Sequence, residues 1–86
     1  MRDPYLNVLA VVAKYAGRPL KFYVEESRVS RGTFFKVKSD LELRGALLKL
    51  ERRQISLNRE KSLSFLADAY PGVTITLPNS VEDRRD

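Results

Sequence analysis

The sequence predicts a single small α+β domain. Apolar residues recur at helical spacing in some segments and alternate with polar residues in others, and turn-forming residues separate these segments. A chain of 86 residues has room for one hydrophobic core. The predicted order is α-β-β-α-β-α-β, a mixed sheet with helices packed on it. Residues 1–78 are expected to form the domain, and the mostly polar residues 79–86 a frayed tail.

The first helix is predicted to run from Pro4 to Ala16. Asp3 is a favourable N-cap residue, and proline is well tolerated at the first helical position. Gly17 is expected to end the helix, with Pro19 just beyond it. Because nearly every position between these ends is apolar, we expect other elements to cover this helix on two sides.

A β-hairpin is predicted within residues 20–38. The segments 20–26 and 33–38 are rich in β-branched and aromatic residues, and the link between them is short. Successive side chains on a strand point to opposite faces, so basic and aromatic residues gather on the outward face. The residues on this face are Lys21, Tyr23, Phe34, Lys36 and Lys38.

The second helix is predicted to begin at the capping box Ser39–Glu42 and to reach Arg53. Leu41 and Leu48 lie seven residues apart, nearly opposite the core stripe of this helix. These two leucines can pack beneath the first helix, form a homodimer seam, or contact a different protein partner.

The last predicted elements are a short strand at 55–57, a third helix and a final strand. Asn58 can cap the helix, which is expected to reach Tyr70 because proline and glycine follow. Residues 73–77 alternate strictly between aliphatic residues and threonine, which is typical of a half-buried strand.

Positive charge is concentrated between Ser27 and Lys61. This segment contains ten Lys and Arg residues and four Asp and Glu residues, whereas the whole chain has a net charge of +5. A basic block in a small protein is typical of proteins that bind polyanions. The sequence therefore predicts a nucleic acid as the partner.

The predicted interface is the outward face of the hairpin together with its connecting loop. Aromatic side chains can stack on bases while cations contact phosphates, as in proteins that bind RNA or single-stranded DNA. These nucleic acids are favoured over duplex DNA, because no predicted helix presents adjacent base-reading polar residues. The predicted nucleic-acid-binding residues are Lys21, Tyr23, Arg28, Arg31, Phe34, Lys36 and Lys38, with Arg52 and Arg53 as further phosphate contacts.

Tyr23 and Phe34 have a second interpretation, because a helix can cover either of them in the core. A shift of one residue in strand register would also exchange the two faces of the hairpin. In that case the loop residues Arg28 and Arg31 would remain as an electrostatic contact.

The alternative function is that of a protein-interaction module or a small subunit of a larger assembly. Such a protein would dock through Leu41 and Leu48, or through the hairpin face. Acidic protein partners attract lysine and arginine as nucleic acids do, so the charge alone leaves both functions open.

Catalysis is not predicted. The chain has neither cysteine nor histidine, which removes the commonest nucleophile–base pairs, disulfides and thiolate metal sites. Its four glycines are scattered, so no glycine-rich phosphate loop is present. We expect no enzyme, no cofactor and no metal site.

The apolar segment Leu6–Ala13 is too short to span a bilayer. The basic residues are spread over several predicted elements and not along one amphipathic helix, so a membrane-surface role is not favoured. No signal peptide is recognised, and a cytoplasmic location is expected.

Overall fold

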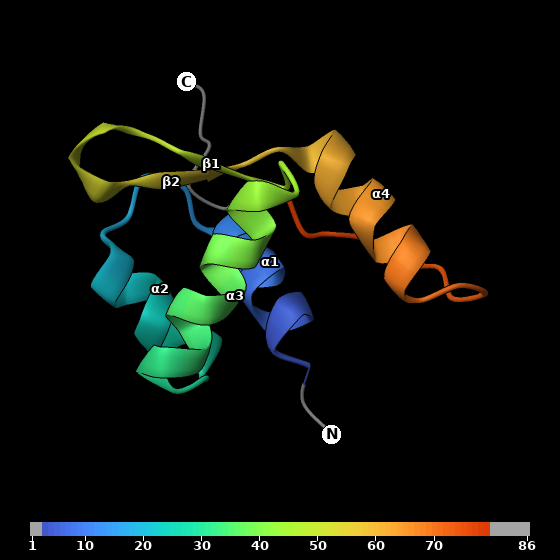
Figure 1. The fold of residues 1–86 in the computed structure, drawn as a ribbon, viewed down its shortest axis with the longest axis horizontal. Helices are drawn as coiled ribbons and strands as arrows, with labels where there is room; N and C mark the ends of the chain where they lie inside the picture. Colours follow the sequence, from blue (N-terminus) through green and yellow to red (C-terminus); the bar gives the residue numbers. More distant parts are fainter. Residues whose placement is uncertain (1–2, 80–86) are drawn as a thin grey trace.

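The computed structural model describes residues 3–79 of the chain, which form helices and one two-stranded antiparallel sheet (Figure 1). The α+β class is thus confirmed. The elements are α1 (Pro4–Lys14), α2 (Leu20–Ser27), α3 (Arg31–Leu43), β1 (Leu47–Lys49), the tight turn η1 (Glu51–Arg53), β2 (Ile55–Leu57) and α4 (Arg59–Ala69).

Helix α1 lies at the centre of the structure and contacts α2, α3, β2 and α4. Asp3 caps it, because its Oδ1 accepts hydrogen bonds from the backbone N–H groups of Tyr5 (2.9 Å) and Leu6 (3.4 Å). Val8 and Leu9 are fully buried. The predicted cap and the cover on more than one side are confirmed, although the helix ends two residues before Ala16.

The predicted hairpin at 20–38 is wrong, because this segment forms α2 and most of α3. Ser30 starts α3, and its Oγ accepts a hydrogen bond from the backbone N–H of Thr33 at 3.2 Å. Phe34, Val37 and Leu41 then recur at helical spacing and are all buried. Burial of this stripe against α1 outweighs the local β-propensity of the aromatic and β-branched residues.

The predicted helix from Ser39 to Arg53 is also wrong. Ser39 lies inside α3, which ends at Leu43. Gly45 then adopts a φ of +81°, a left-handed conformation that favours glycine and turns the chain into β1. Residues 47–57 form the hairpin of the structure, in which Leu47 pairs with Leu57 and Lys49 with Ile55.

The strand at 55–57 and the helix that follows it are confirmed as β2 and α4. Asn58 caps α4, because its Oδ1 accepts a hydrogen bond from the backbone N–H of Lys61 at 3.1 Å. Figure 1 shows α4 on the opposite side of α1 from α2.

Residues 73–77 follow an irregular path in place of the predicted strand. Leu77 is nevertheless buried, and the Arg59 guanidinium donates hydrogen bonds to the carbonyl oxygens of Leu77 (2.8 Å) and Pro78 (3.0 Å). This segment therefore folds back to the start of α4. Of the predicted tail 79–86, all but Asn79 lies outside the described residues.

Candidate nucleic-acid interface

Tyr23 and Phe34 do not form a stacking surface, because both side chains are 0% exposed. The Tyr23 hydroxyl donates a hydrogen bond to the Tyr15 carbonyl at 2.7 Å, which satisfies its polar group inside the core. Phe34 packs edge-on against Phe35, with 5.3 Å between ring centroids. The prediction that these aromatic residues stack on bases is therefore wrong, and the core interpretation holds.

The predicted cations are exposed, with one exception. Lys38 is largely covered and forms an ion pair with Glu42 at 2.9 Å. The other cations form no ion pair with any residue in the described range 3–79, so their charges face solvent. They are Lys21, Arg28, Arg31, Lys36, Arg52 and Arg53.

Helices α2 and α3 form a helix–turn–helix element, since only residues 28–30 connect them. Arg28 ends α2 in the left-handed conformation, at φ 62° and ψ 31°. One face of α3 packs on the core, and the opposite face is open to solvent. The exposed positions of that open face, spaced at four, three and four residues, are Gly32, Lys36, Ser39 and Leu43.

The turn of the hairpin has an unusual backbone. Arg52 and Arg53 have φ values of 60° and 61°, and the Gln54 N–H donates to the Glu51 carbonyl at 3.3 Å. Left-handed φ at both central residues is the mark of a type I′ turn, which strongly prefers Asn-Gly. Two arginines are held here in a conformation that costs about 1–2 kcal/mol for each residue with a Cβ.

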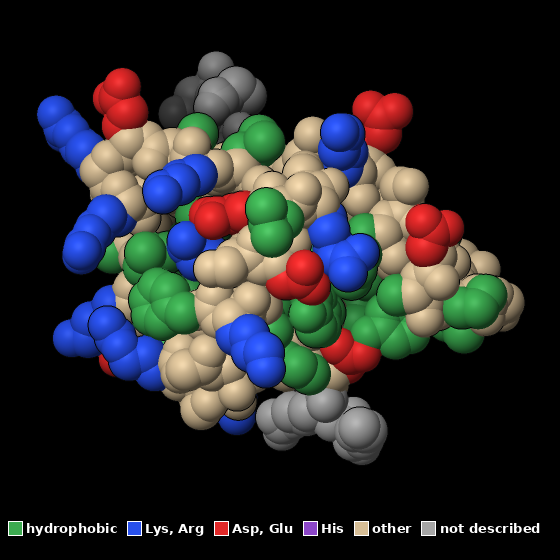
Figure 2. All heavy atoms as spheres, in the orientation of Figure 1, with side chains coloured by type: hydrophobic (Ala, Val, Ile, Leu, Met, Phe, Trp, Pro, Cys, Tyr) green, Lys and Arg blue, Asp and Glu red, His purple; other side chains and the backbone are tan. Residues whose placement is uncertain are grey.

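A groove of about 520 Å³ lies between α2, the first turns of α3 and the hairpin turn. Its walls combine apolar side chains with four cations and a single carboxylate, that of Glu25. Figure 2 shows Lys and Arg side chains around a hydrophobic patch on this side of the molecule. The residues that line it include Lys21, Arg31, Phe35, Arg52, Arg53 and Gln54.

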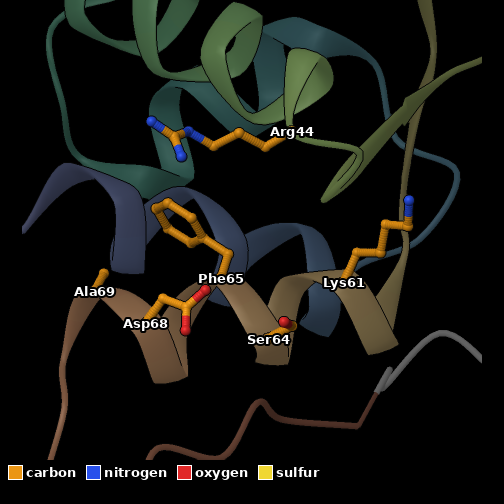
Figure 3. Close-up of a pocket in the computed structure, with 6 residues that line it drawn as sticks. All are labelled: Arg44, Lys61, Ser64, Phe65, Asp68 and Ala69. Atoms are coloured by element: carbon orange, nitrogen blue, oxygen red, sulfur yellow. The ribbon is translucent and has the colours of Figure 1, made fainter.

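A second hollow of about 660 Å³ lies between the end of α3 and α4 (Figure 3). Arg44 reaches over the ring of Phe65, with its guanidinium carbon 5.3 Å from the ring centroid. Asp68 also lines this hollow, and Arg44 is bonded to Asp40 at 3.2 Å. Since charges of both signs meet here, this hollow suits a polyanion less well than the groove beside the hairpin.

A hydrogen bond links α1 to α3 beside this hollow. The Tyr5 hydroxyl donates to Oδ2 of Asp40 at 2.7 Å. This bond lowers the pKa of the Asp40 carboxyl, and the hydrogen bond and charge of Arg44 lower it further. The same bond raises the pKa of Tyr5, with burial as the second cause. The pair is a structural contact between α1 and α3.

The predicted interface at Leu41 and Leu48 is not one surface. Leu41 is buried in the core from α3, whereas Leu48 lies on β1 and is 43% exposed. The two leucines cannot share a helix face, because the chain turns at Gly45 between them. Leu48 alone remains available to a partner.

Sequence reasoning identified the exposed cations but missed their grouping. It placed Arg52 and Arg53 at a helix end, and it gave Phe35 and Gln54 no role beside them. The signal for a tight hairpin turn is Asn-Gly or Asp-Gly, and neither dipeptide is present. The sequence therefore carries no turn signal that could have predicted the tight turn between Leu50 and Gln54.

Comparisons of the chain with family models, with curated proteins and with solved structures gave no match. In the described range 3–79, no helix has the length and apolar character to cross a membrane. The same residues contain no group of three acidic, cysteine or histidine side chains that could hold a metal ion.

Proposed function

We propose that this protein binds nucleic acid, and duplex DNA in particular, through the open face of α3 and the neighbouring hairpin. The observation that carries this proposal is the position of the solvent-facing cations. They lie on α2, α3, the turn between them and the hairpin turn, and Figure 2 shows Lys and Arg side chains gathered over the side of the molecule where α2 and the hairpin lie. A helix–turn–helix element with a basic outer surface is the usual arrangement of proteins that read duplex DNA.

The dimensions of α3 suit the major groove. The groove is about 12 Å wide, and an α-helix with its side chains is about 10–12 Å across. Lys36 and Ser39 stand on the open face of α3, where they can reach base edges. Lysine donates to the acceptors of guanine, and serine can donate or accept at several bases.

Duplex DNA replaces the single-stranded partner favoured from the sequence. That preference depended on a stacking surface, and both aromatic residues expected to form it are buried. It also depended on the lack of a helix that presents polar residues, whereas α3 presents Lys36 and Ser39 to solvent. Both reasons for preferring a single strand have thus been removed.

The test is fluorescence anisotropy with labelled duplex DNA, single-stranded DNA and RNA, each at low and physiological salt. We expect the duplex to bind most tightly, and the double variant Lys36→Gln/Ser39→Ala to bind it at least several-fold more weakly. Lys61→Gln on α4 is the matched control, because it removes one exposed charge outside the proposed interface. Absence of duplex binding at low salt, or an equal loss in the control, would refute the proposal.

A further inference from the structure

We propose that the groove between α2 and the hairpin turn is a phosphate-binding site that holds two consecutive phosphates. If the proposed function holds, the two phosphates are neighbours on one DNA strand. The assignment to DNA therefore rests on the proposed function. The same chemistry would also bind the polyphosphate of a free nucleotide, so the experiment below separates the two sources.

Positive charge from three elements converges in this groove. Lys21 from α2, Arg31 from α3, and Arg52 and Arg53 from the hairpin turn line one groove, with Glu25 as its single acid. Like charges that share a groove repel one another, and this repulsion lowers the stability of the empty protein. A ligand with two or more negative charges removes the repulsion, whereas a simple carboxylate carries too little charge to balance it.

The backbone of the hairpin turn is strained at both arginines. Arg52 and Arg53 occupy left-handed conformations that cost free energy, although Asn-Gly would form the same turn without strain. Backbone strain of this kind is typically found at functional sites. Both arginines line the groove, and guanidinium binds phosphate with paired, parallel hydrogen bonds.

The rest of the groove wall combines an arginine held by a ring, an uncharged donor and apolar side chains. Arg31 lies over the ring of Phe35, with its guanidinium carbon 5.2 Å from the ring centroid. This contact fixes the arginine while its N–H groups stay available. Gln54 adds an uncharged donor at the hairpin side of the groove. Apolar walls with a few polar groups directed inward are the usual composition of a ligand site.

The experiment measures duplex affinity across a salt series for the full chain and two variants. Arg52→Asn/Arg53→Gly removes both arginines and supplies the residues that a type I′ turn prefers, so it should fold at least as well as the wild type. We expect the slope of log affinity against log salt concentration to fall in magnitude by about 1.8, or about 0.9 for each lost phosphate contact. Lys21→Gln should lower the magnitude of the slope by less than about 0.9, because Lys21 shares the two phosphates with the arginines.

The matched control is Lys14→Gln/Lys61→Gln, which removes two exposed charges that lie outside the groove. Its slope should equal that of the wild type. If the groove variants and the control have the same slope while the duplex still binds, the groove inference is wrong and the proposed function stands.

A second arm titrates inorganic tripolyphosphate by calorimetry, without DNA. One outcome is that the wild type binds tripolyphosphate but not duplex DNA, and that Arg52→Asn/Arg53→Gly no longer binds tripolyphosphate. This outcome would support the phosphate site, with a free polyphosphate as its ligand. It would also refute the proposed function. If neither the duplex nor tripolyphosphate binds, both proposals are overturned.

Discussion

At the scale of single residues, some residues predicted to lie at the surface are buried in the core, and others have a strained backbone. Tyr23 was expected on an outward face, yet its hydroxyl bonds to the Tyr15 carbonyl inside the structure. Arg52 and Arg53 are exposed as expected, but their backbone conformation opposes folding. The arginine pair is thus the place where stability and the proposed phosphate binding make opposite demands on the same residues.

Replacing the arginine pair should therefore stabilise the protein. In Arg52→Asn/Arg53→Gly, the strain at two left-handed residues is relieved, and the free energy of unfolding should rise by about 1–2 kcal/mol. Urea denaturation, followed by circular dichroism, measures this change. An unchanged or lower stability would mean that the turn is not strained in the wild type.

Tyr5 controls the acid titration of Asp40. In Tyr5→Phe, the pKa of Asp40 should rise part of the way toward its ordinary value of 3.8, because Arg44 still holds the carboxylate. Folding lowers the pKa of Asp40 in the wild type. The contact therefore contributes to the free energy of unfolding above pH 3.8, and this contribution is lost as the pH falls through the lower pKa of the folded protein. Tyr5→Phe should therefore lose less stability in acid than the wild type.

NMR titration of the Asp40 carboxyl measures this pKa directly. A titration curve identical in the wild type and Tyr5→Phe would rule out the hydrogen bond between α1 and α3. The pKa of Tyr5 is raised above its ordinary value of 10.0. The stabilising contribution of the contact is therefore also lost at alkaline pH, as the pH rises through this raised pKa.

At the scale of elements, the ends of helices were easier to predict than the conformation of the middle of the chain. Asp3 and Asn58 cap α1 and α4 as expected, because a cap depends on neighbouring residues alone. Residues 20–38 form helices in spite of their β-propensity, because α1 offers them an apolar surface. The turn after α3 depends on the left-handed conformation of Gly45, a glycine that falls inside the helix predicted from the sequence.

Two glycine substitutions should act in opposite directions. Gly45→Ala should lower the free energy of unfolding by about 1–2 kcal/mol, because its φ is +81°. The added Cβ would also lie 2.9 Å from Cδ of Lys61, a flexible side chain that can move. Gly32→Ala, inside α3 and with no atom within 4 Å of the added Cβ, should stabilise the protein by about 0.5–1 kcal/mol.

Thermal or urea unfolding of both variants checks this pair. Because each change adds one methyl group, the pair isolates backbone conformation from side-chain size. A stabilising Gly45→Ala would contradict the proposed left-handed turn between α3 and β1.

At the scale of the whole molecule, one small core supports the helices and the hairpin. The core gathers residues of every helix and of both strands around α1. Exposed cations lie on α2, α3 and the hairpin turn, and α4 carries two more, Arg59 and Lys61. The folding of residues 20–57 brings four of the first group, Lys21, Arg31, Arg52 and Arg53, to one groove.

Truncating the core should strongly destabilise the molecule. Phe34→Ala should lower the free energy of unfolding by about 3–5 kcal/mol, a large share of the roughly 5–15 kcal/mol typical of a domain. Leu43→Ala is the control on the same helix, because Leu43 is 88% exposed and its truncation should change stability by less than about 0.5 kcal/mol. Circular dichroism at rising temperature compares the two variants. A Phe34→Ala protein that unfolds at the same temperature as Leu43→Ala would show that Phe34 lies outside the core.

The α+β class, α1, β2 and α4 could be predicted from the sequence because local caps and apolar spacing agree with the final structure. The centre could not, because Phe34, Val37 and Leu41 carry a helical stripe among residues that individually favour strands. For the candidate site, charge alone identified the exposed cations. Their convergence in one groove depends on a turn at Arg52 and Arg53 that arginine rarely forms.

The most direct measurement is an NMR titration of the ¹⁵N-labelled protein with a short DNA duplex. Binding by the proposed face predicts shift changes on α3 around Lys36 and Ser39, at Lys21, and at the hairpin turn. The amide signals of α4 around Leu63 should stay in place. Changes confined to α4, or no change at low salt, would contradict the central claim that the basic face of this protein binds duplex DNA.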